Sequence, residues 1–501
     1  MKKKHKRSTG ILMPIPMLHG GFGIGNLGEE ARGFIDFLKT AGFHAWQVLP
    51  VEQTGSCFSP YKCISTYAGE PMLIDPMGLF EMGLVDENEL SARMEGMKND
   101  SIDYNAVFEK QWNLLRAAFN KLDNKPYMKF KPFWLDEYAL YMAVKAQNNG
   151  APWFEWEDEK LRGYDPLAIK AAEKRLKKEI EFYKFVQWVF DFQWRAVKKY
   201  ANEQGVSIIG DIPIYVSEDS VEVWVRRDLF DATPEGRFPA VGGAPPDYFA
   251  PNGQRWGNPI YNWVKMKKEG YGWWIDRVKA AVERYDIVRL DHFRGFDKYW
   301  SIPFESSDGR EGKWIKGAGM GLFNALKDRF GKLPFIAEDL GADIGEGVER
   351  LLEKTGIRGM RVLQFGFDGE GGHLPHGFTP DRVVYTGTHD NTTLLAWLFE
   401  MTAEKREQAL EYIGFKSDWM EGGVDSPVIK SWIRTLYMSA ASLVIIPIQD
   451  LLGYGGDTRT NTPGTVGGNW RFRIRAGALE QIDSGFYKRL GDIYGRNNEV
   501  L

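Results

Sequence analysis

The sequence predicts an α/β fold, a (β/α)8 TIM barrel with inserted subdomains. Eight short apolar segments follow one another along the chain, and helical patterns separate most of them. Acidic residues stand near the ends of several of these segments, where a parallel barrel collects its polar side chains. The predicted strands cover residues 10–16, 45–51, 206–216, 286–291, 333–339, 360–367, 382–387 and 442–453.

The segments between the strands are mostly helical. Apolar periodicity predicts a helix over residues 29–41 and a helix-rich stretch that ends near residue 205. Two insertions are expected, a helical one at about 76–180 and a substrate loop at about 217–265 that is rich in glycine, proline and aromatic residues. Because no repeat or linker divides the chain, residues 1–501 are predicted to form a single catalytic barrel domain.

One motif near the start resembles a dinucleotide-binding fingerprint. Gly23, Gly25 and Gly28 form the pattern GxGxxG between a predicted strand and a predicted helix. The fingerprint expects a short turn after the first strand and an acidic residue near the end of the second, and this chain has neither. The glycines are therefore interpreted as a tight loop and a helix start, and no cofactor is predicted.

Composition and charge limit the possible partners. Lys and Arg total 64 against 68 Asp and Glu, so the net charge of −4 favours neither nucleic acid nor an acidic membrane surface. No apolar run approaches the length of a membrane span, and the basic start MKKKHKR lacks a signal-peptide cleavage site. The only cysteines, Cys57 and Cys63, argue against a disulfide framework. A cytoplasmic location is expected.

Three acidic residues are the candidate catalytic groups. Asp291 and Glu338 end or follow apolar strands, and Asp390 comes shortly after another. Retaining cleavage of a glycosidic bond needs a nucleophilic carboxylate and a carboxylic acid about 5–5.5 Å apart, and a third carboxylate can hold sugar hydroxyls. Helix capping is the structural alternative for any one of them. Three at strand ends favour sugar transfer.

The segment 242–263 is predicted to be a substrate loop. It combines proline and glycine with aromatic rings and side-chain amides. Apolar ring faces beside amide groups suit a neutral sugar chain, which offers C–H faces and hydroxyls. A structural loop is the alternative interpretation.

Several motifs together resemble one known family. The chain is similar to the amylomaltases, or disproportionating enzymes, which are 4-α-glucanotransferases of glycoside hydrolase family 77. The similarity runs from residue 10 to residue 470 and covers nearly the whole chain. The motifs are SPY (59–61), GDIPIYVSEDS (210–220), PPDYFAPNGQRWGNP (245–259), RLDHFRG (289–295), AEDLG (337–341), THDNTT (388–393) and NTPGTVGGNW (461–470).

The resemblance assigns roles to individual residues. It implies that Asp291 is the nucleophile, Glu338 the acid/base and Asp390 the stabiliser of the transition state. Arg289 lies two residues before Asp291 on the same strand face, so its guanidinium is expected to favour the charged nucleophile. The other substrate-binding residues implied are Ser59, Tyr61, Asp211, Tyr248, Gln254, Trp256, His292, His389, Asn461 and Pro463.

The predicted reaction is retaining transfer of an α-1,4-glucan segment from a maltooligosaccharide to the 4-hydroxyl of another glucan or of glucose. The expected partners are α-1,4-glucans such as maltooligosaccharides and fragments of starch or glycogen, and neither metal nor cofactor is implied. An α-amylase-type retaining hydrolase is the alternative, because it would use the same acids. A catalytically silent glucan-binding protein would be expected to have lost one of them.

Overall fold

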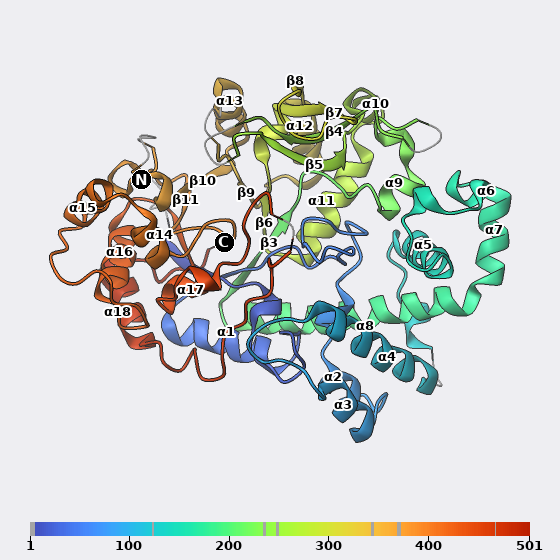
Figure 1. Cartoon of the computed structure of the whole chain (residues 1–501), viewed down its shortest axis with the longest axis horizontal. Coiled ribbons are helices and arrows are strands. Elements are labelled where there is room, and N and C mark those ends of the chain that lie inside the picture. Colours follow the sequence, from blue (N-terminus) through green and yellow to red (C-terminus); the bar gives the residue numbers. More distant parts are fainter. Residues whose placement is uncertain are drawn as a thin grey trace.

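The computed structural model describes residues 6–122, 125–233, 237–246, 250–341, 345–367, 372–465 and 467–500. Eight parallel strands close into a barrel at the centre of the molecule (Figure 1). Each barrel strand pairs with the next barrel strand along the chain, and the last pairs with the first. The strands are β1 (Ser8–Leu12), β2 (Ala45–Gln47), β3 (Ser207–Ile212), β6 (Ile287–Leu290), β9 (Phe335–Ala337), β10 (Arg358–Val362), β11 (Arg382–Tyr385) and β12 (Leu443–Pro447). The predicted fold class is confirmed.

Several strands are shorter than predicted. The first was expected over residues 10–16, but β1 ends at Leu12 and a 3₁₀ turn, η1 (Ile15–Met17), follows. Pro14 and Pro16 lack backbone N–H groups and cannot continue the ladder. The last was expected over 442–453, but β12 ends at Pro447 and the short helix α17 (Ile448–Leu451) takes over. Both segments are apolar, so hydropathy alone does not mark these ends.

Helices surround the barrel. The predicted helix over 29–41 is confirmed as α1 (Glu29–Ala41). It begins after Gly28 and ends before Gly42, which adopts the left-handed conformation. No helix in the described parts of the chain is long and apolar enough to cross a membrane. The other outer helices are α8 (Lys177–Glu203), α11 (Gly272–Arg284), α12 (Met320–Phe330), α13 (Gly345–Thr355), α14 (Leu394–Glu400), α15 (Ala403–Tyr412), α16 (Pro427–Met438) and α18 (Ser484–Tyr494).

The glycines of the GxGxxG pattern serve the backbone. Gly23 has a φ of 77°, and a Cβ atom on Gly25 would lie 2.0 Å from the carbonyl oxygen of Ile15. Gly28 is the N-cap of α1. The interpretation as a tight loop and helix start is thus confirmed.

The region predicted as a helical insertion is helical in the structure. It lies on one side of the barrel, at the right and lower right of Figure 1. The long helix α8 packs against this region, and buried Gln187 and Gln193 on that helix bond to backbone groups of Gly69 and Asp75. Its elements are α2 (Pro76–Glu81), α3 (Glu87–Met94), α4 (Tyr104–Lys121), α5 (Leu135–Gln147), α6 (Glu159–Arg162) and α7 (Pro166–Arg175).

The expected substrate loop contains more regular structure than predicted. β4 (Ala240–Ala244) and β5 (Gln254–Pro259) pair antiparallel and join β7 (Lys298–Pro303) and β8 (Lys313–Lys316) in a sheet of order β5-β4-β7-β8. The sequence hides this sheet because glycines interrupt β4. A Cβ atom on Gly243 would lie 2.1 Å from the carbonyl oxygen of Gln254, so the two strands approach too closely for a larger residue. The same region holds the short helices α9 (Val221–Val225) and α10 (Trp263–Lys268).

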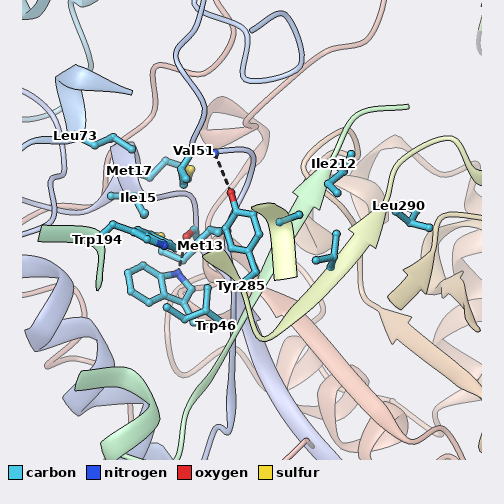
Figure 2. Packing of buried hydrophobic residues seen from close by; sticks show 14 of the residues in the cluster. Met13, Ile15, Met17, Trp46, Val51, Leu73, Trp194, Ile212, Tyr285 and Leu290 are labelled. Carbon is cyan, nitrogen blue, oxygen red and sulfur yellow. Dashed lines mark hydrogen bonds between the residues drawn. The ribbon is translucent and has the colours of Figure 1, made fainter. Parts of the chain in front are cut away.

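The core has two shells. One apolar cluster fills the barrel interior, and a larger one lies between the strands and the surrounding helices. Figure 2 shows part of the outer shell, where the indole N–H of Trp46 donates to the Met13 carbonyl at 2.7 Å and the Tyr285 hydroxyl accepts from the Val51 amide at 3.4 Å. Gly210 on β3 makes room for the Tyr285 ring. This packing fixes the strand ends from which the candidate site is built.

Candidate active site

Neighbouring strands bring Asp291 and Glu338 to the carboxyl end of the barrel. Asp291 follows β6 directly and Glu338 follows β9, and these strands pair in parallel with Leu290 opposite Ala337. The Asp291 amide donates to Ile212 and the Glu338 amide to Leu290, both at 3.0 Å, so the ladder continues through both residues. The predicted nucleophile and the predicted acid/base therefore follow adjacent strands at the carboxyl end of the barrel.

Arg289 links two carboxylates. Its Nη1 atom donates to Asp211 Oδ2 at 2.6 Å and to Asp291 Oδ1 at 2.9 Å. Asp211 and Arg289 are register partners on β3 and β6, and both are buried. Burial lowers the pKa of Arg289, but the surrounding Asp211, Tyr61, Asp291 and Glu338 outweigh it and raise that pKa. The guanidinium is a permanent cation that orients Asp291 through a charge-assisted hydrogen bond.

Asp211 accepts hydrogen bonds from both Arg289 and Tyr61. The Tyr61 hydroxyl donates to Asp211 Oδ2 at 2.8 Å, on the same oxygen that Arg289 holds. Burial raises the pKa of the Asp211 carboxyl, and Arg289 opposes the shift. Two donors on one oxygen favour the charged form. Oδ1 has no hydrogen-bond partner among the described residues. Asp211 lines a cavity of about 20 Å³ together with Tyr61 and Tyr215.

Glu338 has the environment of a general acid. Burial raises its pKa to about 8, with Arg289 opposing and the Asp291 charge adding to the rise. Its Oε2 atom accepts from the His292 amide at 2.6 Å, and Oε1 lies 3.3 Å from the Leu340 amide. A carboxyl group with this pKa is mostly protonated at neutral pH.

Asp390 is held in a turn after β11. Asn461 donates its side-chain N–H to Asp390 Oδ1 at 2.6 Å, and the Nε2 atom of His389 lies 3.4 Å from the same oxygen. The guanidinium of Arg459 donates to the Asp390 carbonyl. Within the same turn, Asn391 Oδ1 accepts hydrogen bonds from the amide and the hydroxyl of Thr388, which closes the turn around Asp390. The side chain of Asp390 is 45% exposed, so its carboxylate can meet a ligand.

Aromatic rings flank this side of the barrel mouth. Tyr61 and His389 stack with centroids 5.0 Å apart and an angle of 16° between planes, and Trp470 tilts against both rings. Burial lowers the pKa of His389, so the imidazole is neutral at neutral pH. Three sequence-distant segments thus meet beside Asp390, and we call Tyr61, His389 and Trp470 the aromatic wall.

The second sheet reaches the site through β5. Trp256 on β5 meets the His292 ring edge to face at 4.8 Å, and its indole N–H donates to Gln254 at 3.1 Å. Gln254 and Trp256, both predicted to bind substrate, are thus linked by contacts to His292, the residue that follows Asp291. Tyr248, the third one predicted on this side, lies outside the described residues.

Two further predicted residues occupy supporting or peripheral positions. Ser59 accepts a hydrogen bond from the Tyr61 amide at 3.3 Å, so it shapes the turn that presents Tyr61. Pro463 is exposed in the loop that leads from Asn461 toward Trp470. Direct contact of either with substrate stays a prediction.

Comparison with known proteins agrees with this geometry. Residues 13–479 match the sequence model of the 4-alpha-glucanotransferase family, glycoside hydrolase family 77. The chain belongs to this family. Family members include the 4-alpha-glucanotransferase of Clostridium butyricum, which is 40% identical over 498 residues that cover 97% of this chain and 100% of the relative. The enzyme of the same name from Aquifex aeolicus is 41% identical over 497 residues, which are 98% of this chain and 99% of the relative.

A solved structure gives the same result. The amylomaltase from Streptococcus agalactiae in complex with acarbose superposes with a TM-score of 0.94 at 36% identity, and the match covers 98% of this chain and 100% of the amylomaltase. These full-length relatives carry transferase names. The hydrolase alternative is therefore not favoured for this member of the 4-alpha-glucanotransferase family.

Two residues of the site were not predicted from the sequence. Trp470 completes the aromatic wall, and Arg459 holds the backbone of Asp390. Trp470 ends the motif NTPGTVGGNW, which could have marked it, whereas nothing in the sequence around Arg459 distinguishes it from a surface cation. Among the described residues, no group of three or more His, Cys, Asp or Glu side chains could hold a metal ion.

Proposed function

We propose that this 4-α-glucanotransferase moves α-1,4-glucan segments between maltooligosaccharides, with Asp291 as nucleophile, Glu338 as acid/base and Asp390 as stabiliser. The observation that carries the proposal is the contrast between the two carboxyl groups on neighbouring strands. Asp291 shares a cation with Asp211, while burial raises the pKa of Glu338 to about 8. Neighbouring carboxyl groups in such different environments have the separate roles that a retaining mechanism needs.

In the first step, Asp291 attacks the anomeric carbon of the donor. Arg289 holds Oδ1, so Oδ2 is the oxygen that forms the bond. Glu338 gives its proton to the glycosidic oxygen as the C–O bond breaks, and the reducing-end fragment leaves as an alcohol. The His292 amide bonds Oε2 at 2.6 Å and the Leu340 amide reaches Oε1 only at 3.3 Å, so the proton is carried on Oε1, the oxygen with the weaker contact.

In the second step, the ionised Glu338 takes the proton of an acceptor 4-hydroxyl. The acceptor oxygen attacks the anomeric carbon, the bond to Asp291 breaks, and the configuration of the donor is retained. Asp390, oriented by Asn461, accepts hydrogen bonds from donor hydroxyls, and these strengthen as the sugar ring flattens.

Transfer requires that an acceptor sugar competes with water for the covalent intermediate. The aromatic wall suits the donor, and Trp256 with Gln254 suits the acceptor, since rings pack against sugar C–H groups and amides bond to hydroxyls. A positioned acceptor gains a large advantage over water in effective concentration.

The cytoplasmic location expected from the cysteine content stays a prediction.

The first test is the product profile from maltotriose. Disproportionation would give glucose and a ladder of longer glucans, while the total of reducing ends stays nearly constant. The variant Asp291→Asn should give no products although it folds normally, since it lacks the nucleophile. Shorter sugars with rising reducing ends would mean hydrolysis, and turnover by Asp291→Asn near the parent rate would contradict the assigned nucleophile.

A further inference from the structure

His292, next to the predicted nucleophile, has an unfavourable backbone conformation. Its φ and ψ are 47° and 52°, in the left-handed region that residues with a Cβ atom seldom adopt. It stands between Asp291 and the 3₁₀ turn η6 (Phe293–Phe296). Strained residues at such positions persist only where their surroundings hold them, and they concentrate at functional sites.

This conformation aims two successive amides at Glu338. The His292 N–H donates to the side-chain oxygen Oε2 at 2.6 Å, and the Phe293 N–H donates to the Glu338 carbonyl at 3.0 Å. The turn at His292 thus holds the side chain of Glu338 with one N–H group and its backbone with the next. In an extended strand, consecutive amides point to opposite sides and would not meet one residue.

The surroundings hold the imidazole in place. Trp256 packs on the ring edge to face at 4.8 Å, and Gly295 lets the chain turn beside it, since a Cβ atom there would lie 3.2 Å from His292 Cδ2. Burial lowers the pKa of His292 to about 4, so the ring is neutral where the enzyme would work. The ring thus links β5 of the second sheet to the turn that contacts Glu338.

We propose that His292 is a positioning residue whose left-handed backbone fixes Glu338 and limits the pH range over which Glu338 stays protonated. The inference rests on the proposed role of Glu338 as acid/base. The charged groups around Glu338 are Arg289 and Asp291 from β6 and the adjacent Asp339, which is paired with Arg361 of β10 at 3.0 Å. Two backbone amides also contact the carboxyl group, and the His292 amide at 2.6 Å is closer than the Leu340 amide at 3.3 Å, so it stabilises the ionised carboxylate more.

The sign of the effect follows from the role of the acid. Glu338 must be protonated for the first step, so kcat/KM falls as pH rises through its pKa. A hydrogen bond from the amide favours the carboxylate and holds that pKa down. Removing the bond should move the alkaline limb of kcat/KM to higher pH by about one unit, the size expected for one hydrogen bond to a charged group.

Three substitutions separate the backbone from the ring. His292→Gly and His292→Val both remove the imidazole, but glycine accepts the left-handed conformation and valine does not. We expect the alkaline limb of His292→Gly to stay at the parent pH and that of His292→Val to rise. His292→Asn should also keep the parent limb, because asparagine tolerates this conformation. If His292→Val fails to fold, His292→Ala replaces it.

The outcomes are distinct. The same shift in His292→Gly and His292→Val would overturn the proposal, because loss of the ring would then explain it. No shift in either variant would also overturn it, because neither the ring nor the backbone would then control the alkaline limb. With an activated glucosyl donor, whose leaving group needs no protonation, the alkaline limb of kcat/KM should disappear in every variant. Failure of the acid/base assignment itself would appear elsewhere, as near-normal maltotriose turnover by Glu338→Gln.

Discussion

The chemistry of the site depends on how two carboxyl groups of the same type differ in their surroundings. Arg289 gives Asp291 a cationic neighbour at 2.9 Å, whereas Glu338 is half-buried and receives a short hydrogen bond from a backbone amide. Desolvation disfavours the charged form, and a cation in contact favours it. Each residue is thereby suited to one role at the start of the reaction.

Glu338→Gln separates these roles. Glutamine cannot give a proton, so turnover of maltotriose should fall by roughly two to four orders of magnitude, the usual contribution of general acid–base catalysis. With a glucosyl fluoride, the first step needs no acid but the second still lacks its base. Intact-mass spectrometry should therefore show a glycosyl adduct on the protein.

The adduct should map to the peptide that contains Asp291 and be absent from the double variant Asp291→Asn/Glu338→Gln. Glu404→Gln is the control, because it makes the same side-chain change at an exposed position on α15 and should give no adduct. An adduct on another residue would assign the nucleophile elsewhere.

The three acids could be predicted because each one ends or closely follows an apolar run in the sequence. It also predicted most of the residues that now lie around them, through the family motifs. The left-handed backbone of His292 and the bond from Arg459 to the Asp390 carbonyl could not be predicted. Both depend on how sequence-distant segments meet, which no local pattern records.

Strands and helices were predictable to different degrees. All eight barrel strands were found, because buried parallel strands are continuous apolar runs. Their ends were less certain, since the apolar run after β12 continues into α17. β4 was missed because Gly242 and Gly243 have low strand propensity, and close contact with its neighbours selects them here.

The interior of the barrel should carry much of its stability. Leu443 on β12 is fully buried in the interior cluster, whereas Leu167 on α7 is 80% exposed. Leu443→Ala should lower the free energy of unfolding by about 2–5 kcal/mol, and Leu167→Ala should change it by less than about 0.5 kcal/mol. Guanidinium denaturation followed by tryptophan fluorescence measures both.

Because the two variants have the same side-chain change, they differ only in location. Similar midpoints would mean that the interior shell relaxes around the loss, or that another part of the chain unfolds first. Unchanged kcat/KM in Leu167→Ala would confirm that the folded enzyme is otherwise intact.

The whole molecule is closed by contacts between segments from its two ends. β1 pairs with β12, and the Ser8 hydroxyl donates to the Asn498 carbonyl at 2.6 Å. Arg496 is fully buried beside this junction. Its guanidinium donates to the carbonyls of Tyr437 at 2.8 Å, Ser439 at 2.8 Å and Ala441 at 3.0 Å. These carbonyls lie at the end of α16 and in the turn before β12, so one side chain joins the last helices to the closing strand pair.

Arg496→Met should therefore weaken the closure of the barrel without touching the site. Methionine fills similar space but leaves several buried carbonyls without donors, and we expect a loss of roughly 3 kcal/mol or more in the free energy of unfolding. Arg489→Met, on the exposed side of α18 with a distant partner in Asp483 at 3.9 Å, should change it by less than about 0.5 kcal/mol. Hydrogen exchange should show faster opening of β1 and β12 in Arg496→Met alone. Equal exchange in the two variants would mean that strand pairing closes the barrel without this arginine.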